Sequence, residues 1–70
     1  MAEVRAELVA NVVSVFVDEG EAVEDGDTLV MLESMMMEIP VVAEGVGTVR
    51  KVVVKEGDTV QRGDLIAVVD

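Results

Sequence analysis

Few side chains in this sequence have the chemistry that catalysis needs. The chain contains no histidine and no cysteine, the residue types that supply most nucleophiles, near-neutral proton shuttles and transition-metal ligands. Ser14 and Ser34 are the only serines, and no base is present to activate either. The acidic residues fall mainly beside glycines, as in turns, and lack the spacing of an EF-hand loop. We therefore expect no catalytic residue, no metal site and no independent enzyme activity.

Length and composition restrict the class of protein. Seventy residues suit a single domain, residues 1–70, close to the lower size at which one hydrophobic core is stable. Hydrophobic residues make up 51% of the chain, with many valines and one aromatic residue, Phe16, so the core must consist of branched aliphatic side chains that favour strands. We expect an all-β domain.

The charge of the chain limits its partners. The formal net charge is −10, which repels phosphate backbones and anionic lipid, so we expect binding to neither nucleic acid nor membrane. No apolar run is long enough to span a bilayer, and the start Met1-Ala2-Glu3 lacks the basic residues of a signal peptide. We expect a cytoplasmic monomer.

An internal repeat divides the chain into two halves. With an offset of 37 residues, VVSVFVDEGEAVEDGDTLVMLE (12–33) aligns with VRKVVVKEGDTVQRGDLIAVVD (49–70). Two copies are too few for a solenoid, so the halves are expected to pack on one another with approximate two-fold symmetry around one core.

Each half reads as a strand, a glycine turn, a short apolar link, a Gly-Asp turn and a second strand. The period-two pattern predicts that four valines at matched positions point inward. They are Val15, Val17, Val52 and Val54. The segment EVRAELVA (3–10) is predicted to be an opening strand with Val4, Ala6 and Leu8 on one face. The strand in EIPVVA must lie at an edge, because Pro40 cannot donate a hydrogen bond to a neighbouring strand.

The segment LESMMMEIP (32–40) joins the two halves between predicted strands 28–33 and 38–42, so it is expected to form the tip of a hairpin. Side chains alternate across a strand, so at least one of the three consecutive methionines must face outward. Local propensity disagrees, because these residues favour helix and no Asn-Gly or Asp-Gly marks a tight turn. Such conflicts are typical of functional sites, but the residue pattern alone favours methionines that fill an irregular gap in the core.

The two similar halves on either side of ESMMMEIP resemble the biotinyl/lipoyl attachment domains. The pattern E-S-M-x-M-E resembles the biotin-carrier signature, in which a lysine stands between two methionines. The resemblance covers nearly the whole chain and includes the Gly-Asp turns, the proline after the hairpin and the ending GTVRKVVVKEGDTVQRGDLIAVVD. Met35 and Met37 match the biotin branch of the family. The chain resembles its short, thumbless, free-standing attachment proteins.

This resemblance implies a flattened β-barrel, the barrel-sandwich hybrid, built from two four-stranded antiparallel sheets with pseudo-two-fold symmetry. It places the modified lysine on an exposed hairpin opposite the chain ends. In the family, biotin protein ligase joins biotin to that lysine, and the carrier moves carboxybiotin between biotin carboxylase and carboxyltransferase. The implied role is that of a carrier domain in a multi-component biotin-dependent carboxylase, which tethers the cofactor at high effective concentration.

Position 36 departs from the family pattern, because Met36 stands where the family has lysine. A thioether cannot form the amide bond to biotin that a lysine amine forms. Biotin is therefore the cofactor of the family, but we expect none on this chain. The resemblance assigns Met36 as the attachment position, with Met35, Met37, Glu33 and Glu38 as residues for ligase recognition and positioning. Ordinary hairpin packing is the alternative for these four neighbours.

Two explanations account for Met36. We favour an introduced replacement of lysine, since methionine keeps roughly the length and flexibility of lysine without its charge. The alternative is a natural, attachment-deficient relative that works as a protein-interaction module, with the methionine-rich tip as an adaptable apolar contact. A lipoyl-type carrier is a further alternative to the biotin carrier.

Overall fold

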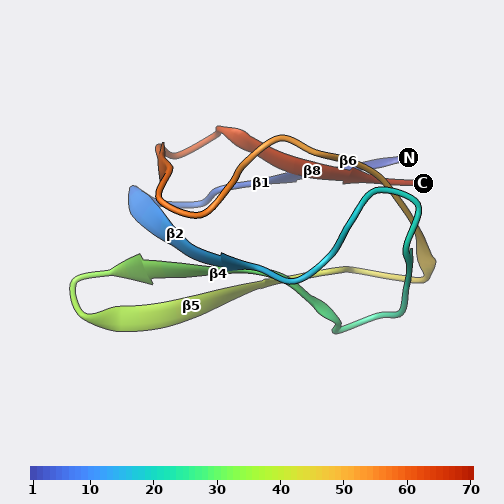
Figure 1. Ribbon diagram of the computed structural model, residues 1–70, viewed down its shortest axis with the longest axis horizontal. Helices are drawn as coiled ribbons and strands as arrows, with labels where there is room; N and C mark the ends of the chain where they lie inside the picture. The colour runs from blue at the N-terminus through green and yellow to red at the C-terminus, as the bar shows by residue number, and fades with distance from the viewer.

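The computed structural model describes residues 1–70 as a molecule built entirely of strands, turns and loops, with dimensions of 31 × 17 × 17 Å. The eight strands are β1 (Ala2–Arg5), β2 (Ala10–Val15), β3 (Ala22–Val23), β4 (Thr28–Ser34), β5 (Met37–Val42), β6 (Gly47–Val52), β7 (Thr59–Val60) and β8 (Leu65–Val69). Both chain ends lie at one end of the long axis, and the β4–β5 hairpin lies at the other (Figure 1). No helix capable of crossing a membrane is present.

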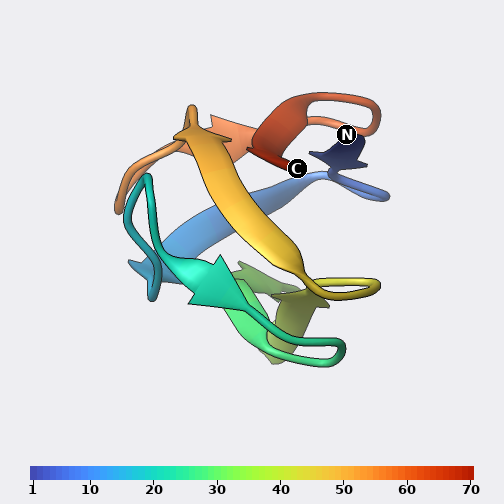
Figure 2. The ribbon, with the colours of Figure 1, turned by 90° about the vertical axis from the view of Figure 1, so that its right-hand side faces the viewer.

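The strands form two antiparallel sheets. One sheet has the order β1-β8-β6-β3 and the other the order β5-β4-β2-β7. Seen along the long axis, the strands surround a common interior (Figure 2). The prediction of an all-β flattened barrel with two four-stranded sheets is therefore confirmed.

The two sheets are equivalent under the 37-residue offset. Strands β2, β3 and β4 of the first half begin at residues that map onto the first residues of β6, β7 and β8, and β1 maps onto the end of β5. Even an irregularity repeats, because the register shift between Val12 and Ser14 recurs between Val49 and Lys51. The repeat in the sequence thus appears as pseudo-two-fold symmetry, as predicted.

Acidic side chains in the turns bind backbone amides at equivalent places in the two halves. The amide of Glu24 donates to Oδ2 of Asp27 at 2.8 Å, and the amide of Gln61 donates to Oδ2 of Asp64 at 2.8 Å. In such a bond the side-chain carboxylate accepts from the amide in place of a backbone carbonyl, and this stabilises the turn. The interpretation of Asp27 and Asp64 as turn residues is therefore confirmed.

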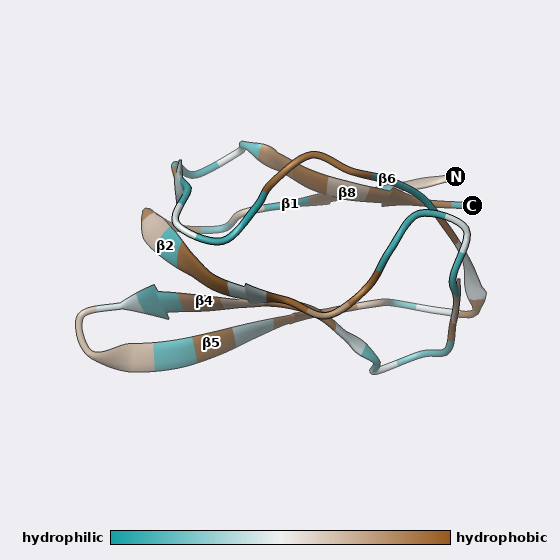
Figure 3. Cartoon of the chain, viewed as in Figure 1, coloured by the Kyte–Doolittle hydropathy of each residue, from teal (hydrophilic) through white to brown (hydrophobic).

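The core lies between the sheets and contains only apolar side chains. Strands β2, β4 and β8 carry much of the hydrophobic sequence, whereas most of the turns other than the β4–β5 loop are hydrophilic (Figure 3). The largest fully buried side chains come from both halves: Leu29, Val30, Leu32, Val49 and Ile66. Of the four valines predicted to point inward, Val17 is buried, and Val15, Val52 and Val54 are half-buried against the core.

The opening segment differs from its prediction. The expected strand over residues 3–10 ends at Arg5, and β2 begins at Ala10 in the other sheet. The chain must cross between the sheets, and on the way the amide of Ala6 donates to the carbonyl of Asp64 at 2.8 Å. Leu8 therefore lies outside any strand, although its side chain still packs against the core. The edge position predicted from Pro40 is confirmed, because β5 is the outer strand of its sheet.

Candidate functional site

The β4–β5 hairpin closes with a two-residue loop. Pairing of β4 with β5 continues to Ser34 and Met37, which leaves Met35 and Met36 as the loop. Their φ angles are 52° and 66°. Positive φ at both central residues is the requirement of a type I′ turn, whose twist suits a two-residue hairpin. The predicted hairpin tip is confirmed, and the helical preference of its residues is overridden.

Strand pairing imposes this conformation on residues that do not favour it. The left-handed region costs roughly 1–2 kcal/mol for a residue with a side chain. The pairing of β4 with β5 extends from Thr28 opposite Val42 to the tip and includes buried Leu32 opposite half-buried Ile39. Because these contacts fix the register, the two loop residues must adopt positive φ.

All three consecutive methionines face solvent. The exposed fractions of Met35, Met36 and Met37 are 91%, 95% and 63%. The interpretation in which they fill a gap in the core is therefore wrong. Hairpin register explains the result, because two of the three methionines form the loop itself and have no strand opposite them.

The predicted glutamates stand directly below the tip. Glu33 and Glu38 are opposite one another across β4 and β5, and both are exposed. Neither takes part in an ion pair, since the two pairs in the structure are Arg5–Glu3 and Arg50–Asp70. The structure thus brings all five predicted site residues into the segment 33–38, and their roles in ligase recognition stay a prediction.

The tip lacks the functional group that covalent attachment of a carboxylic acid requires. Met36 ends in a thioether, which has no N–H from which an amide can form. Lys51 lies in β6 and Lys55 in the turn that follows, so neither lysine is on the hairpin. The residues present at the tip therefore do not fit a covalently attached biotin.

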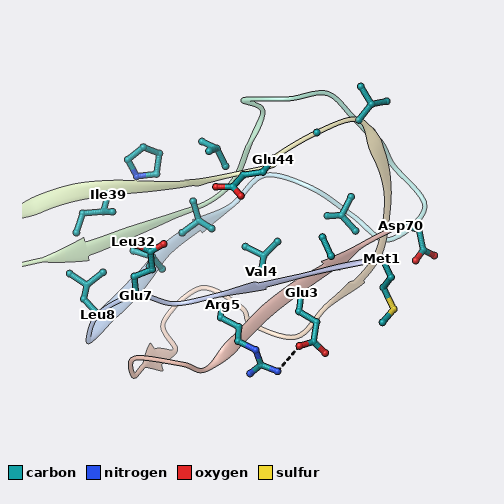
Figure 4. A pocket seen from close by; sticks show the side chains of 17 residues that line it. Met1, Glu3, Val4, Arg5, Glu7, Leu8, Leu32, Ile39, Glu44 and Asp70 are labelled. Atoms are coloured by element: carbon teal, nitrogen blue, oxygen red, sulfur yellow. Dashed lines mark hydrogen bonds and ion pairs between the residues drawn. The ribbon is translucent and has the colours of Figure 1, made fainter.

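A groove of about 480 Å³ lies between the edge strands β1 and β5, and the sequence analysis did not predict it (Figure 4). Val4 and Val41, which are related by the repeat, both line the groove, as do Leu32 and Val69. The groove exists because β1 and β5 are outer strands that pair with no common neighbour. The repeat relates these two strands, so it was the signal in the sequence that could have revealed the groove. Its one cationic side chain, Arg5, is held by Glu3 at 2.8 Å, and its acidic residues form no cluster that could hold a metal ion. The groove is therefore not a candidate metal site.

Comparison with known proteins shows strong similarity along the whole chain. The family described as "Biotin-requiring enzyme" matches residues 2–69. The biotinylated protein TB7.3 homolog of Mycolicibacterium smegmatis is 65% identical over 68 residues, which cover 97% of this chain and 96% of that protein.

Solved structures show the same fold. The urea carboxylase of Kluyveromyces lactis superposes with a TM-score of 0.92 at 33% identity over 99% of this chain, which corresponds to only 6% of that enzyme. The lipoyl domain of the 2-oxoglutarate dehydrogenase complex of Azotobacter vinelandii has a TM-score of 0.79 at 25% identity, covering 96% of this chain and 95% of that domain. This chain belongs to the biotinyl/lipoyl domain family of biotin-requiring enzymes.

Proposed function

We propose that this chain is a biotin carboxyl carrier-type domain in which methionine replaces the attachment lysine. A loaded domain of this type moves carboxybiotin between biotin carboxylase and carboxyltransferase. The observation that carries the proposal is the place of position 36, which is 95% exposed on a two-residue turn. That turn lies at the end of the long axis opposite both chain ends (Figure 1).

The arrangement suits a carrier more than an enzyme. The paired strands β4 and β5 hold the tip out from the core, so another protein can approach it from several sides. Because the chain ends are at the far end of the barrel, chain attached there does not obstruct the tip. A tethered group gains effective concentration at the sites that its tether reaches, whereas the chemistry belongs to the cofactor and the partner enzymes.

The family resemblance also suggests roles for the neighbours of Met36, and their position supports these roles. We assign Met35, Met37, Glu33 and Glu38 as the surface that a biotin protein ligase contacts. All four are exposed and lie within three residues of the attachment position. With Met36 in place, this surface presents no amine, so the present chain does not accept biotin. Replacement of a lysine accounts best for a methionine at the centre of an otherwise complete carrier tip.

The direct test restores the lysine. Met36→Lys is incubated with a biotin protein ligase, biotin and ATP, and the intact mass is measured. We expect the variant to gain one biotinyl group and the present chain to gain none. Met36→Arg is the matched control, because it supplies length and positive charge without an amine that the ligase can acylate. The proposal fails if Met36→Lys stays unmodified although it is folded.

The same variant separates a biotin carrier from a lipoyl carrier. Met36→Lys is offered lipoate with a lipoate ligase in a parallel reaction. We expect faster loading with biotin, in keeping with the 65% identity to a relative named as a biotinylated protein, against 25% for the lipoyl domain. Faster loading with lipoate would move the proposal to the lipoyl branch.

A second candidate function is protein interaction without any attached group. Three exposed methionines at one tip favour it, since flexible thioether side chains adapt to varied apolar surfaces. This candidate predicts that the purified biotin carboxylase of the same organism binds the present chain and that Met36→Ser weakens the complex. Equal binding of the two chains, or none by either, would exclude an interaction of the tip with this enzyme.

A further inference from the structure

We propose that Met35, Met36 and Met37 form a binding site for a soft monovalent cation, Cu(I) or Ag(I), which we call the thioether tip. The proposal concerns the chain as it stands, with methionine at position 36, and it does not depend on the carrier function. Thioether sulfur is a soft, neutral donor that selects Cu(I) over hard cations such as Mg²⁺ and Ca²⁺. The three consecutive methionines would therefore supply three thioether ligands and no other type of ligand.

The three sulfur atoms are available to a ligand. The side chains are 91%, 95% and 63% exposed, so no packing contact has to break before they bind. Met31 differs, because it is half-buried in β4 opposite Pro40. Met1 is also exposed, at 79%, but its Sδ already accepts a contact from Nη1 of Arg50 at 3.5 Å, and it lies at the other end of the barrel from the tip (Figure 1).

The backbone places the three donors within reach of one ion. Consecutive Cα atoms are about 3.8 Å apart, and the loop turns the chain back on itself within two residues. Rotation about Cα–Cβ and Cβ–Cγ moves each sulfur atom, so these exposed side chains can turn their sulfur atoms towards one another without a change in backbone conformation. Met35 and Met36 thus supply two flexible donors from the loop, and Met37 supplies a third from the first paired position. This arrangement suits a d¹⁰ cation, which has no strong preference for one coordination geometry.

The charge around the tip favours a cation of any kind. Glu33 and Glu38 face one another directly below the loop, and neither has a cationic partner. Like charges directly opposite on a sheet repel, so a bound cation above them reduces an unfavourable interaction. The glutamates attract cations in general, and the thioethers make the binding selective for soft cations.

The backbone strain of the turn points the same way. Met35 and Met36 are the two residues other than glycine with positive φ. Asn-Gly would fit this turn with less strain, yet the chain keeps two thioethers there. Strained backbone is found mainly at functional and ligand-binding sites, so the strain supports a binding role for this turn.

The test is a titration of the present chain with silver nitrate in chloride-free buffer. Ag(I) serves as the probe because it is soft and does not undergo redox cycling. The methyl groups of all methionines are followed by ¹H–¹³C NMR. We expect the resonances of Met35, Met36 and Met37 to shift together and to saturate at one equivalent, while Met31 remains unchanged. Mg²⁺ at the same ionic strength should leave all of them in place.

Leucine variants identify the donors. Leucine keeps the apolar volume of methionine without sulfur, and these exposed positions lie outside the core, so the fold should persist. In metal sites even the groups that support a ligand contribute about 10- to 100-fold to affinity, so we expect Met35→Leu, Met36→Leu and Met37→Leu each to weaken Ag(I) binding by at least about tenfold. Met31→Leu is the matched control and should bind as the present chain does.

Several outcomes would overturn the proposal. They are independent titration of the three methyl groups at different silver concentrations, an equal response of Met31, the same shifts with Mg²⁺, and unchanged affinity in the three leucine variants at the tip. None of these results bears on whether Met36→Lys accepts biotin. The failure of this proposal and the failure of the carrier function are therefore distinguishable.

Discussion

The Gly-Asp turns within the halves and the hairpin turn between them place different residues at positive φ. Gly26 and Gly63 occupy equivalent turns and have φ angles of 88° and 93°. At the hairpin tip, Met35 and Met36 have φ angles of 52° and 66°. Glycine adopts such angles without strain, whereas methionine does not. Positive φ is therefore accommodated without strain in the Gly-Asp turns within the halves, but with strain in the hairpin turn that joins the halves.

The two kinds of turn also differ in what depends on them. The amide of Gly26 donates to the carbonyl of Ala43, and the amide of Gly63 donates to the carbonyl of Ala6, both at 2.8 Å. These bonds tie the Gly-Asp turns to the segments that connect the sheets. The tip extends into solvent and its side chains are almost completely exposed. The comparison indicates that backbone geometry determines the residue in the internal turns and that side-chain chemistry determines it at the tip.

The largest effect is expected when a Gly-Asp turn receives a side chain. Gly26→Ala and Gly63→Ala should each lower the free energy of unfolding by about 1–3 kcal/mol, the usual cost of a residue held in a sparsely populated backbone region. No atom lies within 4 Å of the added Cβ at either position, so the cost comes from the backbone and not from a clash. Urea denaturation followed by circular dichroism measures the change.

Arg62→Ala is the control for this pair, because Arg62 is the exposed neighbour of Gly63 and its side chain forms no ion pair. We expect it to alter stability by less than about 0.5 kcal/mol. Equal stability of Gly63→Ala and Arg62→Ala would show that positive φ is not required in the internal turns, and the contrast with the tip would disappear.

A smaller and opposite effect is expected at the tip. Met36→Gly removes roughly 1–2 kcal/mol of left-handed strain. It also adds backbone entropy to the unfolded chain, which costs roughly 0.5–1 kcal/mol. The variant should therefore be more stable than the present chain by up to about 1.5 kcal/mol in the same urea measurement. Met36→Ala keeps the strain and should show no gain, so a similar gain from alanine would contradict the explanation.

Much of the fold was predictable because the repeat and the strand period are local properties of the sequence. Aligning the halves predicted the symmetry of the sheets, and Pro40 predicted an edge strand. The period could not reveal which sheet a segment joins, and this is why the opening strand was predicted too long. Nor could it predict unequal burial of Val17 and Val54, which depends on the atoms that other segments place over them.

The sequence predicted where the candidate site lies, but it did not predict the register of the hairpin or the exposure of the methionines. Alternation required only one outward methionine among the three, and the structure exposes all of them. The deciding fact is the pairing of Ser34 with Met37, because a register with a longer loop would have placed other side chains at the tip. Register results from all the pairings along β4 and β5 together with the burial of residues such as Leu32, and the preferences of single residues do not encode it.

The smallest effect concerns the charges below the tip, where Glu33 and Glu38 oppose one another. Cross-strand pairs contribute about 0.2–1 kcal/mol, so Glu38→Lys should raise stability by a few tenths of a kcal/mol as repulsion becomes attraction. Glu56→Lys changes the net charge equally at an exposed residue that forms no ion pair, and it serves as the control. The difference between the two variants should shrink in 1 M salt, where exposed charges are screened within about 3 Å. If Glu38→Lys and Glu56→Lys stabilise the chain equally in low salt, the gain reflects net charge alone, and the tip carries no local repulsion for a cation to relieve.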